Sequence, residues 1–525
     1  MIKNAKEAPE GTYRVLIRVE DILNEDAPDY LDLSLYKLYS IYVKEKNNYL
    51  TDGWARTWGG TEYDAGMAVA SDGFGNIYVG GRFADEVDFH PGIDDVVIRT
   101  SNGESDCFLA RYDSSGKFKW VQTWGGTGYD AVNGIDVSND GQIFVVGYFN
   151  NTVDFDPGSG TFTATASGGR DAFISKFDIT GNWHWTKILG GSGIEEAKAV
   201  AYLRSIDQPM NRLYACGSFS EQIIYDDGGP VGLSNGSEDV FLVKINPVTG
   251  TFIWGKNWGG NNLDQANDIN VTWSEIQGMD RVYVCGLFYN NSGGTGIDFD
   301  PCPGELIRQS AGMADAFTSK FNGTTGNHIL TYTWGSENGD AATALNAHHI
   351  NGWFVGGYIG GQINLNPTGG FDISQHYGGA DAFIVGLNSS NDEYMWGTVF
   401  GGSGSDSIGG ISGGVWGHPY IVGSFEGTVD FNPGIEINEF TSNGGSDCFL
   451  LWLQTDMQFI WARTWGGSMS DCTFAVTRDS NYDVYTSGLF YETVDFSPET
   501  YTDYHTSGGK ADAFLLKYNM NGQWD

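Results

Sequence analysis

A short pattern recurs seven times along the chain: a large apolar residue, a glycine-rich pair and, shortly afterwards, an acid. "KWVQTWGGTGYDA" at 119–131 is one copy, and "WARTWGGTEYDA" at 54–65 is another. The residues before the glycines are Trp58, Trp124, Leu189, Trp258, Trp334, Phe400 and Trp465. Self-similarity at a nearly even spacing indicates one repeat array rather than several unrelated domains.

Each repeat contains the same order of segments. After the acid come an alternating run such as "NGIDV", a turn such as "SNDGQ", an apolar run such as "IFVVGYF", a "TVDFDPG" segment and a "SGGRDAFISKFD" segment. This order predicts four strands per repeat, bounded by Gly, Asn and Asp turns. Four-stranded sheets repeated around an axis form a β-propeller. We therefore predict an all-β fold, a seven-bladed β-propeller of four-stranded blades, over residues 54–525.

The two ends of the array predict how the ring closes. The last repeat stops at "NMNGQWD", before the next apolar position, whereas residues 54–58 supply an extra "WARTW" with no strand upstream of it. We expect residues 54–58 to be the outer strand of the final blade. The ring would then be latched between its first and last repeats.

The units "WGGTGYDAVNGIDVSNDGQIFVVGYFNNTVDF" and "SGGRDAFISKFDITGNWHW" resemble the SBBP repeat, a seven-bladed β-propeller repeat of bacterial and archaeal surface proteins and some phage proteins. The resemblance covers residues 54–525. It implies the fold and a surface location. It implies no activity, because the family has no shared catalytic chemistry.

Charge and hydropathy exclude several partners. The formal net charge is -38, and nucleic acid binding needs basic residues that displace counterions from phosphates. We therefore expect no nucleic acid partner and no binding to anionic membrane surfaces. No apolar run reaches membrane-spanning length, and residues 1–25 hold no run typical of a signal peptide. We expect no membrane insertion, and export either without such a signal or after its removal.

The six cysteines follow the repeat instead of suggesting disulfides. Cys107 and Cys448 stand where the second repeat has Ala172, and Cys216 and Cys285 stand where it has a valine. Equivalent positions in separate repeats face equivalent places, and cysteine packs well as a small buried apolar residue. We expect free thiols.

The glycine pair is interpreted as the sharp passage from one blade to the next, which suits glycine because it takes positive φ at no steric cost, and the preceding aromatic residue as a wedge between blades. The acids form three ladders. The first ladder consists of Asp64, Asp130, Glu195, Asp264, Asp340, Asp406 and Asp471. The second ladder consists of Asp106, Asp171, Asp239, Asp315, Asp381, Asp447 and Asp512. The third ladder is partial and consists of Asp88, Asp154, Asp298, Asp430 and Asp495, with Asn364 at the same position in the fifth repeat.

Each ladder has a structural interpretation, because Asp readily accepts hydrogen bonds from turn amides. For the first ladder an alternative stays open: seven carboxylates facing the central channel would form a cation site, with Ca²⁺ the natural ion. The "VDFDPG" acids of the third ladder also present oxygen atoms suited to Ca²⁺. No other cofactor is indicated.

No catalytic motif stands out. The sequence shows no zinc-protease helix pair, nucleophile elbow or phosphate-binding loop. An acid that recurs in every repeat is better suited to scaffolding, because chemistry needs an asymmetric cluster. We therefore predict that the chain is not an enzyme.

Insertions break the symmetry in the third and fourth repeats, at "LRSIDQPMN", "TWSEIQGMD" and "YNNSGGTG". Insertions map to loops, where binding sites concentrate. A partner site including Trp273, Tyr289 and Asn290 is one interpretation, and neutral variation in loop length is the other.

Residues 1–53 lie outside the repeat and form an extension. "TYRVLIRV" and "LDLSLYKLYSIYV" alternate apolar and polar residues and predict two strands. An isolated hairpin is marginal in water, so we expect it to pair with another chain. The candidate partner-binding residues of the extension are Leu31, Leu33, Leu35, Tyr39, Ile41 and Val43.

Together these features predict a non-enzymatic structural or binding propeller on an extracellular, cell-surface or virion assembly. Its partners would be other protein chains, contacted or adhered to through the extension and the blade loops. Two alternatives stay open: a lectin-like propeller that binds glycans, and a polysaccharide lyase or hydrolase.

Overall fold

A computed structural model describes residues 11–18, 36–43, 53–90, 96–203, 212–228, 232–274, 277–291, 293–348, 352–414, 417–497 and 502–524. Tertiary contacts divide the chain into two compact units, one within Met1–Asp52 and the other Gly53–Trp524. In the smaller unit, β1 (Gly11–Arg18) pairs antiparallel with β2 (Tyr36–Val43). Tyr39, Ile41 and Val43 lie on β2, whereas Leu31, Leu33 and Leu35 fall outside the described residues.

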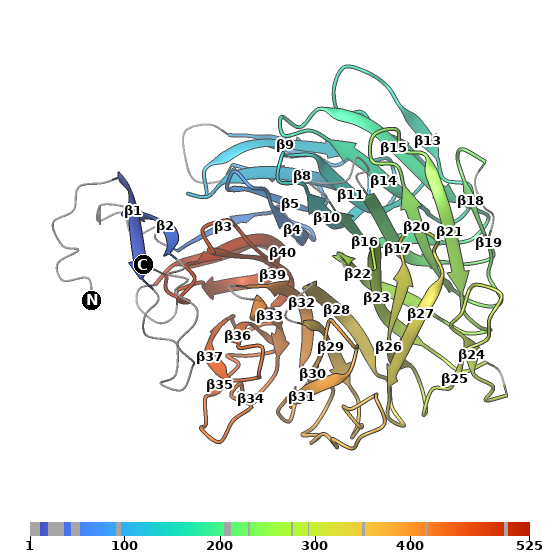
Figure 1. The fold of residues 1–525 in the computed structure, drawn as a ribbon. Coiled ribbons are helices and arrows are strands. Elements are labelled where there is room, and N and C mark those ends of the chain that lie inside the picture. Colours follow the sequence, from blue (N-terminus) through green and yellow to red (C-terminus); the bar gives the residue numbers. More distant parts are fainter. Residues whose placement is uncertain are drawn as a thin grey trace. The chain divides into compact units, whose positions relative to one another are not determined.

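The larger unit is a seven-bladed propeller (Figure 1), as the repeat predicts. Each blade is an antiparallel sheet, and the first strands of successive blades contact one another around a central channel. In chain order the blades are β4 (Ala65–Ser71), β5 (Asn76–Phe83), β8 (Asp106–Asp113) and β9 (Phe118–Trp124); β10 (Ala131–Val137), β11 (Ile143–Phe149), β14 (Asp171–Phe177) and β15 (Trp183–Gly190); β16 (Glu195–Leu203), β17 (Arg212–Phe219), β20 (Asp239–Ile245) and β21 (Phe252–Trp258); β22 (Gln265–Ser274), β23 (Met279–Phe288), β26 (Asp315–Asn322) and β27 (His328–Trp334); β28 (Ala341–His348), β29 (Gly352–Ile359), β30 (Asp381–Leu387) and β31 (Tyr394–Phe400); β32 (Ser407–Gly413), β33 (Pro419–Phe425), β36 (Asp447–Leu453) and β37 (Phe459–Trp465); and β38 (Cys472–Arg478), β39 (Val484–Asp495), β40 (Tyr504–Tyr518) and β3 (Trp54–Trp58).

The "VDF" segments add a feature that the four-strand prediction omits. Between the second and third strands of most blades they form small satellite hairpins, namely β6 (Glu86–Asp88) with β7 (Ile98–Thr100), β12 (Thr152–Asp154) with β13 (Thr163–Thr165), β18 (Gln222–Tyr225) with β19 (Gly232–Leu233), β24 (Ile297–Asp298) with β25 (Ile307–Arg308), and β34 (Thr428–Asp430) with β35 (Glu439–Thr441). In blade 7 the same pairing continues directly from β39 and β40. In blade 5 it shrinks to a single bridge between Asn364 and Ile373.

The ring is closed by β3, which confirms the predicted latch. β3 is the outer strand of blade 7 and pairs antiparallel with β40, with Trp54 opposite Lys517 and Trp58 opposite Ala513. The backbone N–H of Gly53 also bonds to the carbonyl of Trp524. The first and last segments of the propeller therefore share one sheet.

The core is divided into seven hydrophobic clusters, each of which spans the interface between two neighbouring blades. The Trp before the glycines is a wedge, as expected: Trp58 of blade 7 meets Phe108 of blade 1 edge to face, with ring centroids 5.8 Å apart. Trp124 of blade 1 packs in the same way on Phe173 of blade 2, at 6.2 Å, and also lies against Phe177 at 5.2 Å. Aromatic pairs of this kind favour the blade interfaces beyond the area that they bury.

A second Trp near the start of the outer strand docks on a turn of the next blade. Trp54 Nε1 donates to the Ser114 carbonyl, and Trp120 Nε1 donates to the Ile179 carbonyl, both at 3.2 Å. Gly116 lies against the Trp54 ring with φ of 75°, a conformation that glycine adopts without strain. The hydrogen bond and the ring contact therefore add a polar interaction to the apolar contact between blades 7 and 1, and the hydrogen bond does so between blades 1 and 2.

The structure also bears on two smaller points of the sequence. All six cysteines are free, and Cys107, Cys216, Cys285 and Cys448 are buried in the core, as expected from the repeat. Within the described ranges, no helix has the length and apolar character needed to span a bilayer.

We predict that the latch supports the whole ring. Trp58→Ala removes a ring that is 2% exposed and should lower the free energy of unfolding by about 3–5 kcal/mol, the usual cost of truncating a buried Trp. Deleting residues 54–58 should expose the edge of β40 and cause aggregation. Thermal melting and light scattering would measure both effects. The exposed Thr61→Ala serves as a control, and an unchanged melting temperature in the deletion would refute the latch.

Candidate functional site

The repeated glycines are explained by close packing at the joint between blades. A Cβ atom on Gly125 would overlap the carboxyl group of Asp106, a second-ladder residue of the same blade. The same overlap occurs for the first glycine of every pair, namely Gly59 with Asp512, Gly190 with Asp171, Gly259 with Asp239, Gly335 with Asp315, Gly401 with Asp381, and Gly466 with Asp447. Among the glycines of the pairs, only Gly259 has positive φ, at 155°. Freedom to adopt positive φ, the reason expected for the glycines, is therefore not why they recur, because space for the carboxyl group is what excludes a side chain.

The neighbouring blade leaves no room for a side chain on the second glycine of the pair. A Cβ atom on Gly60 would lie 2.7 Å from the carbonyl oxygen of Glu86, at the start of the satellite hairpin of blade 1. On Gly467 it would lie 2.7 Å from the carbonyl oxygen of Thr493 in blade 7. The turn between blades is thus held between an aspartate on one side and a satellite backbone on the other.

The first-ladder aspartates accept hydrogen bonds from the backbone of this turn. Asp130 Oδ2 accepts the Gly126 N–H at 2.7 Å, and its Oδ1 accepts the Asn150 N–H at 2.8 Å. The corresponding pairs of bonds form at Asp64, Asp264, Asp340, Asp406 and Asp471. Each acid therefore ties the turn to the end of the second strand of its own blade.

These positions do not fit a channel-facing ring of carboxylates. The first-ladder residues are buried, 0 to 2% exposed; they are Asp64, Asp130, Glu195, Asp264, Asp340, Asp406 and Asp471. The six aspartates among them each cap their own blade joint. The channel is lined instead by residues further along the first strands. Among the residues that the structure describes, no group of three or more His, Cys, Asp or Glu side chains is arranged to hold a metal ion. The turn-capping interpretation fits the geometry.

Each joint brings one acid of the first ladder near one acid of the second. Burial raises the pKa of Asp106 to about 6, and the nearby Asp130 adds to the effect. Burial likewise raises the pKa of Asp64 to about 7, helped by Asp512, and that of Glu195 to about 9, helped by Asp171. The same coupling of neighbouring acids acts at the other four joints. The joints therefore form seven pairs of carboxyl groups that favour binding protons.

Third-ladder acids also serve turns. Asp154 Oδ1 accepts the N–H groups of Asp156 at 3.2 Å and Phe162 at 2.8 Å. In blade 5 the amide oxygen of Asn364 accepts two equivalent N–H groups at 3.2 and 2.8 Å. Because a neutral amide replaces the carboxylate in the same geometry, the turn needs an acceptor oxygen and not a charge. This favours the turn interpretation over Ca²⁺ binding.

The central channel is lined by residues that the sequence analysis did not single out. Each first strand has a register shift two to four residues after its first-ladder acid, which leaves one residue unpaired. These residues are Met67, Asn133, Lys198, Asn267, Thr343, Gly409 and Phe474, and they line a cavity of about 380 Å³. Asn133 Nδ2 and Asn267 Nδ2 donate to carbonyls of the next blade. The sequence gives no clear signal for these residues, because both neighbouring positions also vary between repeats.

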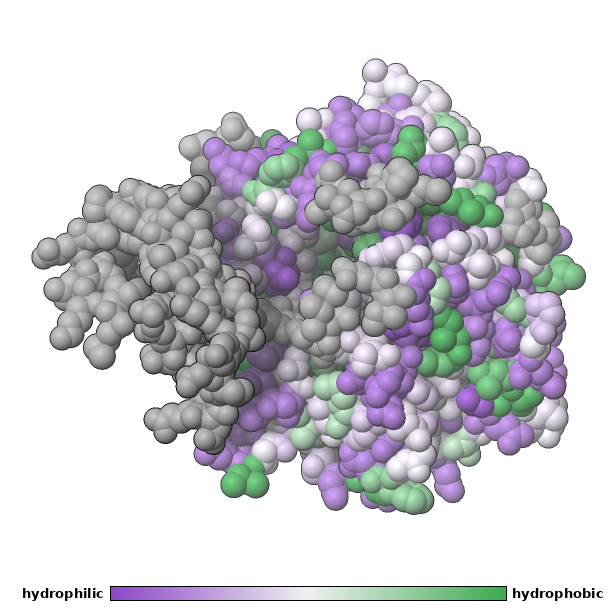
Figure 2. All heavy atoms as spheres, in the orientation of Figure 1, coloured by the Kyte–Doolittle hydropathy of each residue, from purple (hydrophilic) through white to green (hydrophobic). Residues whose placement is uncertain are grey.

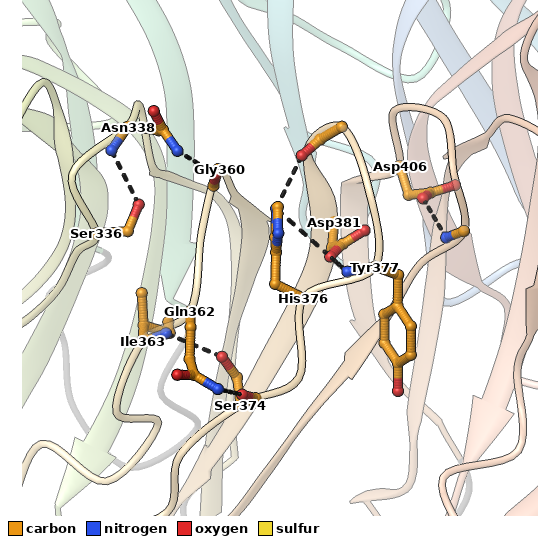
Figure 3. Close-up of polar contacts among 12 residues, drawn as sticks. Ser336, Asn338, Gly360, Gln362, Ile363, Ser374, His376, Tyr377, Asp381 and Asp406 are labelled. Carbon is orange, nitrogen blue, oxygen red and sulfur yellow. Dashed lines mark hydrogen bonds and ion pairs between the residues drawn. The ribbon is translucent and has the colours of Figure 1, made fainter.

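A second cavity, of about 320 Å³, opens on the face that carries the glycine turns, at blades 5 to 7. Its lining is rich in hydroxyl groups and includes Tyr358, Ser405, Ser407, Ser424, Ser446 and Ser470. The neighbouring loop of blade 5 holds His376 beside Asp381 (Figure 3), with His376 Nε2 3.8 Å from Asp381 Oδ2. Asp381 accepts the Tyr377 N–H at 2.6 Å, and His376 Nε2 lies 3.0 Å from the Gly379 carbonyl, an acceptor. Because a carbonyl oxygen only accepts, His376 Nε2 carries a proton and donates it. His376 and Asp381 thus hold the turn of this loop with hydrogen bonds.

The structure places the residues of the predicted partner site in blade 4 far from one another. Trp273 lies near the end of β22, where the guanidinium of Arg212 covers its ring at 4.6 Å. Tyr289 and Asn290 follow β23 at the opposite end of the same strand pair, roughly 30 Å away by strand length, and Asn290 N–H donates to Ser310 Oγ. The prediction of one site is wrong, because the loop after a first strand and the loop after a second strand lie on opposite faces of a propeller.

Comparisons with known proteins give distant similarity. No protein-family model matches the chain. A WD repeat-containing protein of Acanthamoeba polyphaga mimivirus is 26% identical over 46% of this chain and 19% of its own length. The regulatory protein FlaEY of Caulobacter vibrioides is 24% identical over 64% of this chain and 34% of its own length. This chain thus spans about a third or less of these relatives.

Two solved structures cover most of the chain. The Dos1 propeller aligns with 9% identity and a TM-score of 0.41, over 88% of this chain and 95% of its own. A rhamnogalacturonan lyase of Bacillus licheniformis aligns with 10% identity and a TM-score of 0.30, over 89% of this chain and 91% of its own. The propeller assignment rests on the strand pairing itself, and the activity of either protein is not transferred.

We predict that a single methyl group at a joint is costly. Gly125→Ala forces the Asp106 carboxyl group away from its turn, and overpacking of this kind costs about 1–3 kcal/mol. Gly339→Ala is the matched control, because a Cβ atom there meets nothing within 4 Å. Urea unfolding of both variants measures the difference. Equal stability of the two would contradict the packing explanation.

We also predict that the propeller is more stable at pH 5 than at pH 7.5. The pKa of these joint acids is about 6 or 7 in the folded state and about 4 in the unfolded state. Between these values the folded state binds more protons than the unfolded state, so protonation stabilises the fold. Their contribution is complete below the unfolded pKa and is lost as pH rises through the folded pKa. Asp178 does not affect this comparison, because hydrogen bonds lower its pKa to about 2 against the effect of burial and the group is ionised in both states from pH 5 to pH 7.5.

Melting temperature against pH would test the sign of this dependence. Asp512→Asn removes one titrating group and keeps the acceptor oxygen that binds the Gly508 N–H. The variant should have a flatter pH profile and gain stability at pH 7.5 relative to the parent. A parent profile that rises from pH 5 to pH 7.5 would refute the protonated joints.

Proposed function

We propose that the chain is a non-enzymatic propeller of the SBBP type that acts as a rigid binding module of an extracellular, cell-surface or virion assembly. Its partners are other protein chains, bound through the blade loops and the N-terminal extension. The observation that carries the proposal is the use of the repeated acids. The aspartates of all three ladders, the features of the sequence closest to a metal or acid–base site, are engaged in capping turns at the blades.

The distribution of variation supports a scaffold that presents different loops. Repeated positions form the joints, whereas the positions that differ between blades lie in the channel, at its mouths and on the satellite hairpins. Loops on a rigid scaffold are where binding residues concentrate. On the face drawn in Figure 2, hydrophobic residues form small separate patches among hydrophilic ones. Such a surface suits several contacts with partner chains better than one large buried interface.

A second candidate function is glycan binding. The channel sets the amide of Asn267 and the hydroxyl group of Thr343 on one part of its wall, and Met67 and Phe474 on another. Pockets that combine apolar surface with a few polar groups are the usual small-ligand sites. Reproducible binding on a glycan array would favour this function, and turnover of a polysaccharide would favour a lyase or hydrolase.

The extension provides the decisive test of the first proposal. Removing residues 1–52 should leave a folded propeller, because the ring closes through β3, but should prevent incorporation into the native assembly. Leu33→Lys with Ile41→Lys should likewise release soluble chains with unchanged propeller melting. Asp26→Lys, in the acidic loop expected to face solvent, is the control. The readout is the fraction of chain that sediments with envelopes or particles, and normal incorporation of the truncated chain would refute the proposal.

A further inference from the structure

Cationic residues are unevenly distributed along the chain. No Lys or Arg occurs between Lys320 and Arg463, a stretch that includes all of blade 5 and the part of blade 6 that precedes Arg463 in its outer strand. Every formally charged side chain in that stretch is an Asp or a Glu. Within this stretch the acids have no cation of their own, and the ion pair at Asp392 is made with Lys320 of blade 4.

The same two blades expose apolar residues on their satellite segments. Phe371 in blade 5 and Ile437 in blade 6 stand at one repeat position, directly before the N–H that binds the third-ladder oxygen, and they are 90% and 74% exposed. Thr161 and Thr502 hold that position in blades 2 and 7, where they are also exposed. The exposed position is polar in blades 2, 4 and 7, where it is Thr161, Glu305 and Thr502, and apolar in blade 1, where it is Val96, and in the adjacent blades 5 and 6.

These segments lie around one turn on the face of the propeller that carries the glycine turns. The Gly379 N–H of the blade 5 loop donates to the Gly404 carbonyl in the turn between blades 5 and 6. Past that turn, the Glu426 N–H at the start of the blade 6 satellite donates to Asp406 Oδ1 at 3.0 Å. We call this surface the acidic rim and define it by Phe371, Ile373, Tyr377, Ile435, Glu436 and Ile437, all of which are exposed.

The β1–β2 hairpin has the complementary composition. Its two strands, "GTYRVLIR" and "YKLYSIYV", contain Arg14, Arg18 and Lys37 and no acid, and their other residues are mostly apolar. A two-stranded sheet has unpaired backbone groups along both edges and is marginal by itself in water. The hairpin therefore needs a partner surface that is acidic and partly apolar.

We propose that the β1–β2 hairpin of one copy docks on the acidic rim of a second copy of this chain. Two copies that each carry a net charge of -38 repel one another except where cations are concentrated, so the cation-bearing hairpin is the part best able to approach the rim. Contact with the hairpin covers Phe371 and Ile437, and it brings a strand that contains Arg14 and Arg18 to a rim that contains Glu436. The proposal rests on the proposed role of the extension in assembly, and it names another copy as a partner.

Sedimentation velocity of the full chain tests this contact. Between about 1 and 100 μM, the range of a moderate association, the average mass should rise with concentration. Phe371→Lys with Ile437→Lys should weaken the association at least tenfold. Thr161→Lys with Thr502→Lys is the matched control, because it adds the same two charges at the same repeat position in blades 2 and 7. Arg14→Glu with Arg18→Glu should weaken the association as the rim variant does.

A mixing experiment separates contact from a change in total charge. The rim variant keeps its basic hairpin and the Arg14→Glu/Arg18→Glu variant keeps its acidic rim, so a mixture of the two should associate although neither does so alone. A chain that stays monomeric at every concentration overturns the proposal. An equal loss of association in the Thr161→Lys/Thr502→Lys control, or association that persists in the rim variant, also overturns it.

These outcomes are distinct from failure of the proposed function. If the truncated chain is lost from the native assembly but the purified full chain is monomeric, the extension binds a different protein and only the present inference fails. If the truncated chain is incorporated normally, the assembly role of the extension fails, whatever the oligomeric state of the purified chain.

Discussion

The contact between a buried aspartate and a glycine backbone at each blade joint is the constraint on which the rest of the propeller depends. At the first joint Asp106 occupies the space beside Gly125, so the chain can leave one blade and begin the next within a few residues. The preceding Trp124 is then placed against the aromatic rings of blade 2, and Asp130 is placed beneath the turn amides. Packing and hydrogen bonding of the joint thus follow from one close approach.

This arrangement buries two carboxyl groups per joint, which has an electrostatic consequence. Burying a charge is costly unless it is hydrogen-bonded or neutralised, and here both occur. Backbone N–H groups bind the oxygens, and the raised pKa values show that protonation relieves the remaining cost. A carboxyl group used in this way is not available for a substrate or a metal ion. The acids that recur most regularly along the chain are therefore part of its scaffold.

Function is then left to positions that differ between blades. The unpaired residues of the first strands give the channel a polar part and an apolar part, and the satellite segments give blades 5 and 6 an outer surface unlike that of blades 2 and 7. A ring of equivalent blades can carry such differences at little cost, because the joints do not involve these side chains. Asymmetry of charge and exposure, and not the repeat, distinguishes one sector of this propeller from another.

The sequence by itself determined the fold class, the number of blades, the latch by residues 54–58, the Trp wedges and the free cysteines, because each follows from equivalent residues at equivalent positions. Only the tertiary structure decided why the glycines recur, since Gly125 and Asp106 are distant in sequence and meet only when the outer strand pairs with the third. It also decided that Trp273 and Tyr289 lie at opposite ends of their strands, and that the residues lining the channel are the unpaired ones. A period along a chain shows which positions are equivalent, but the face on which a residue emerges depends on strand register and bulges, which only pairing between distant segments defines.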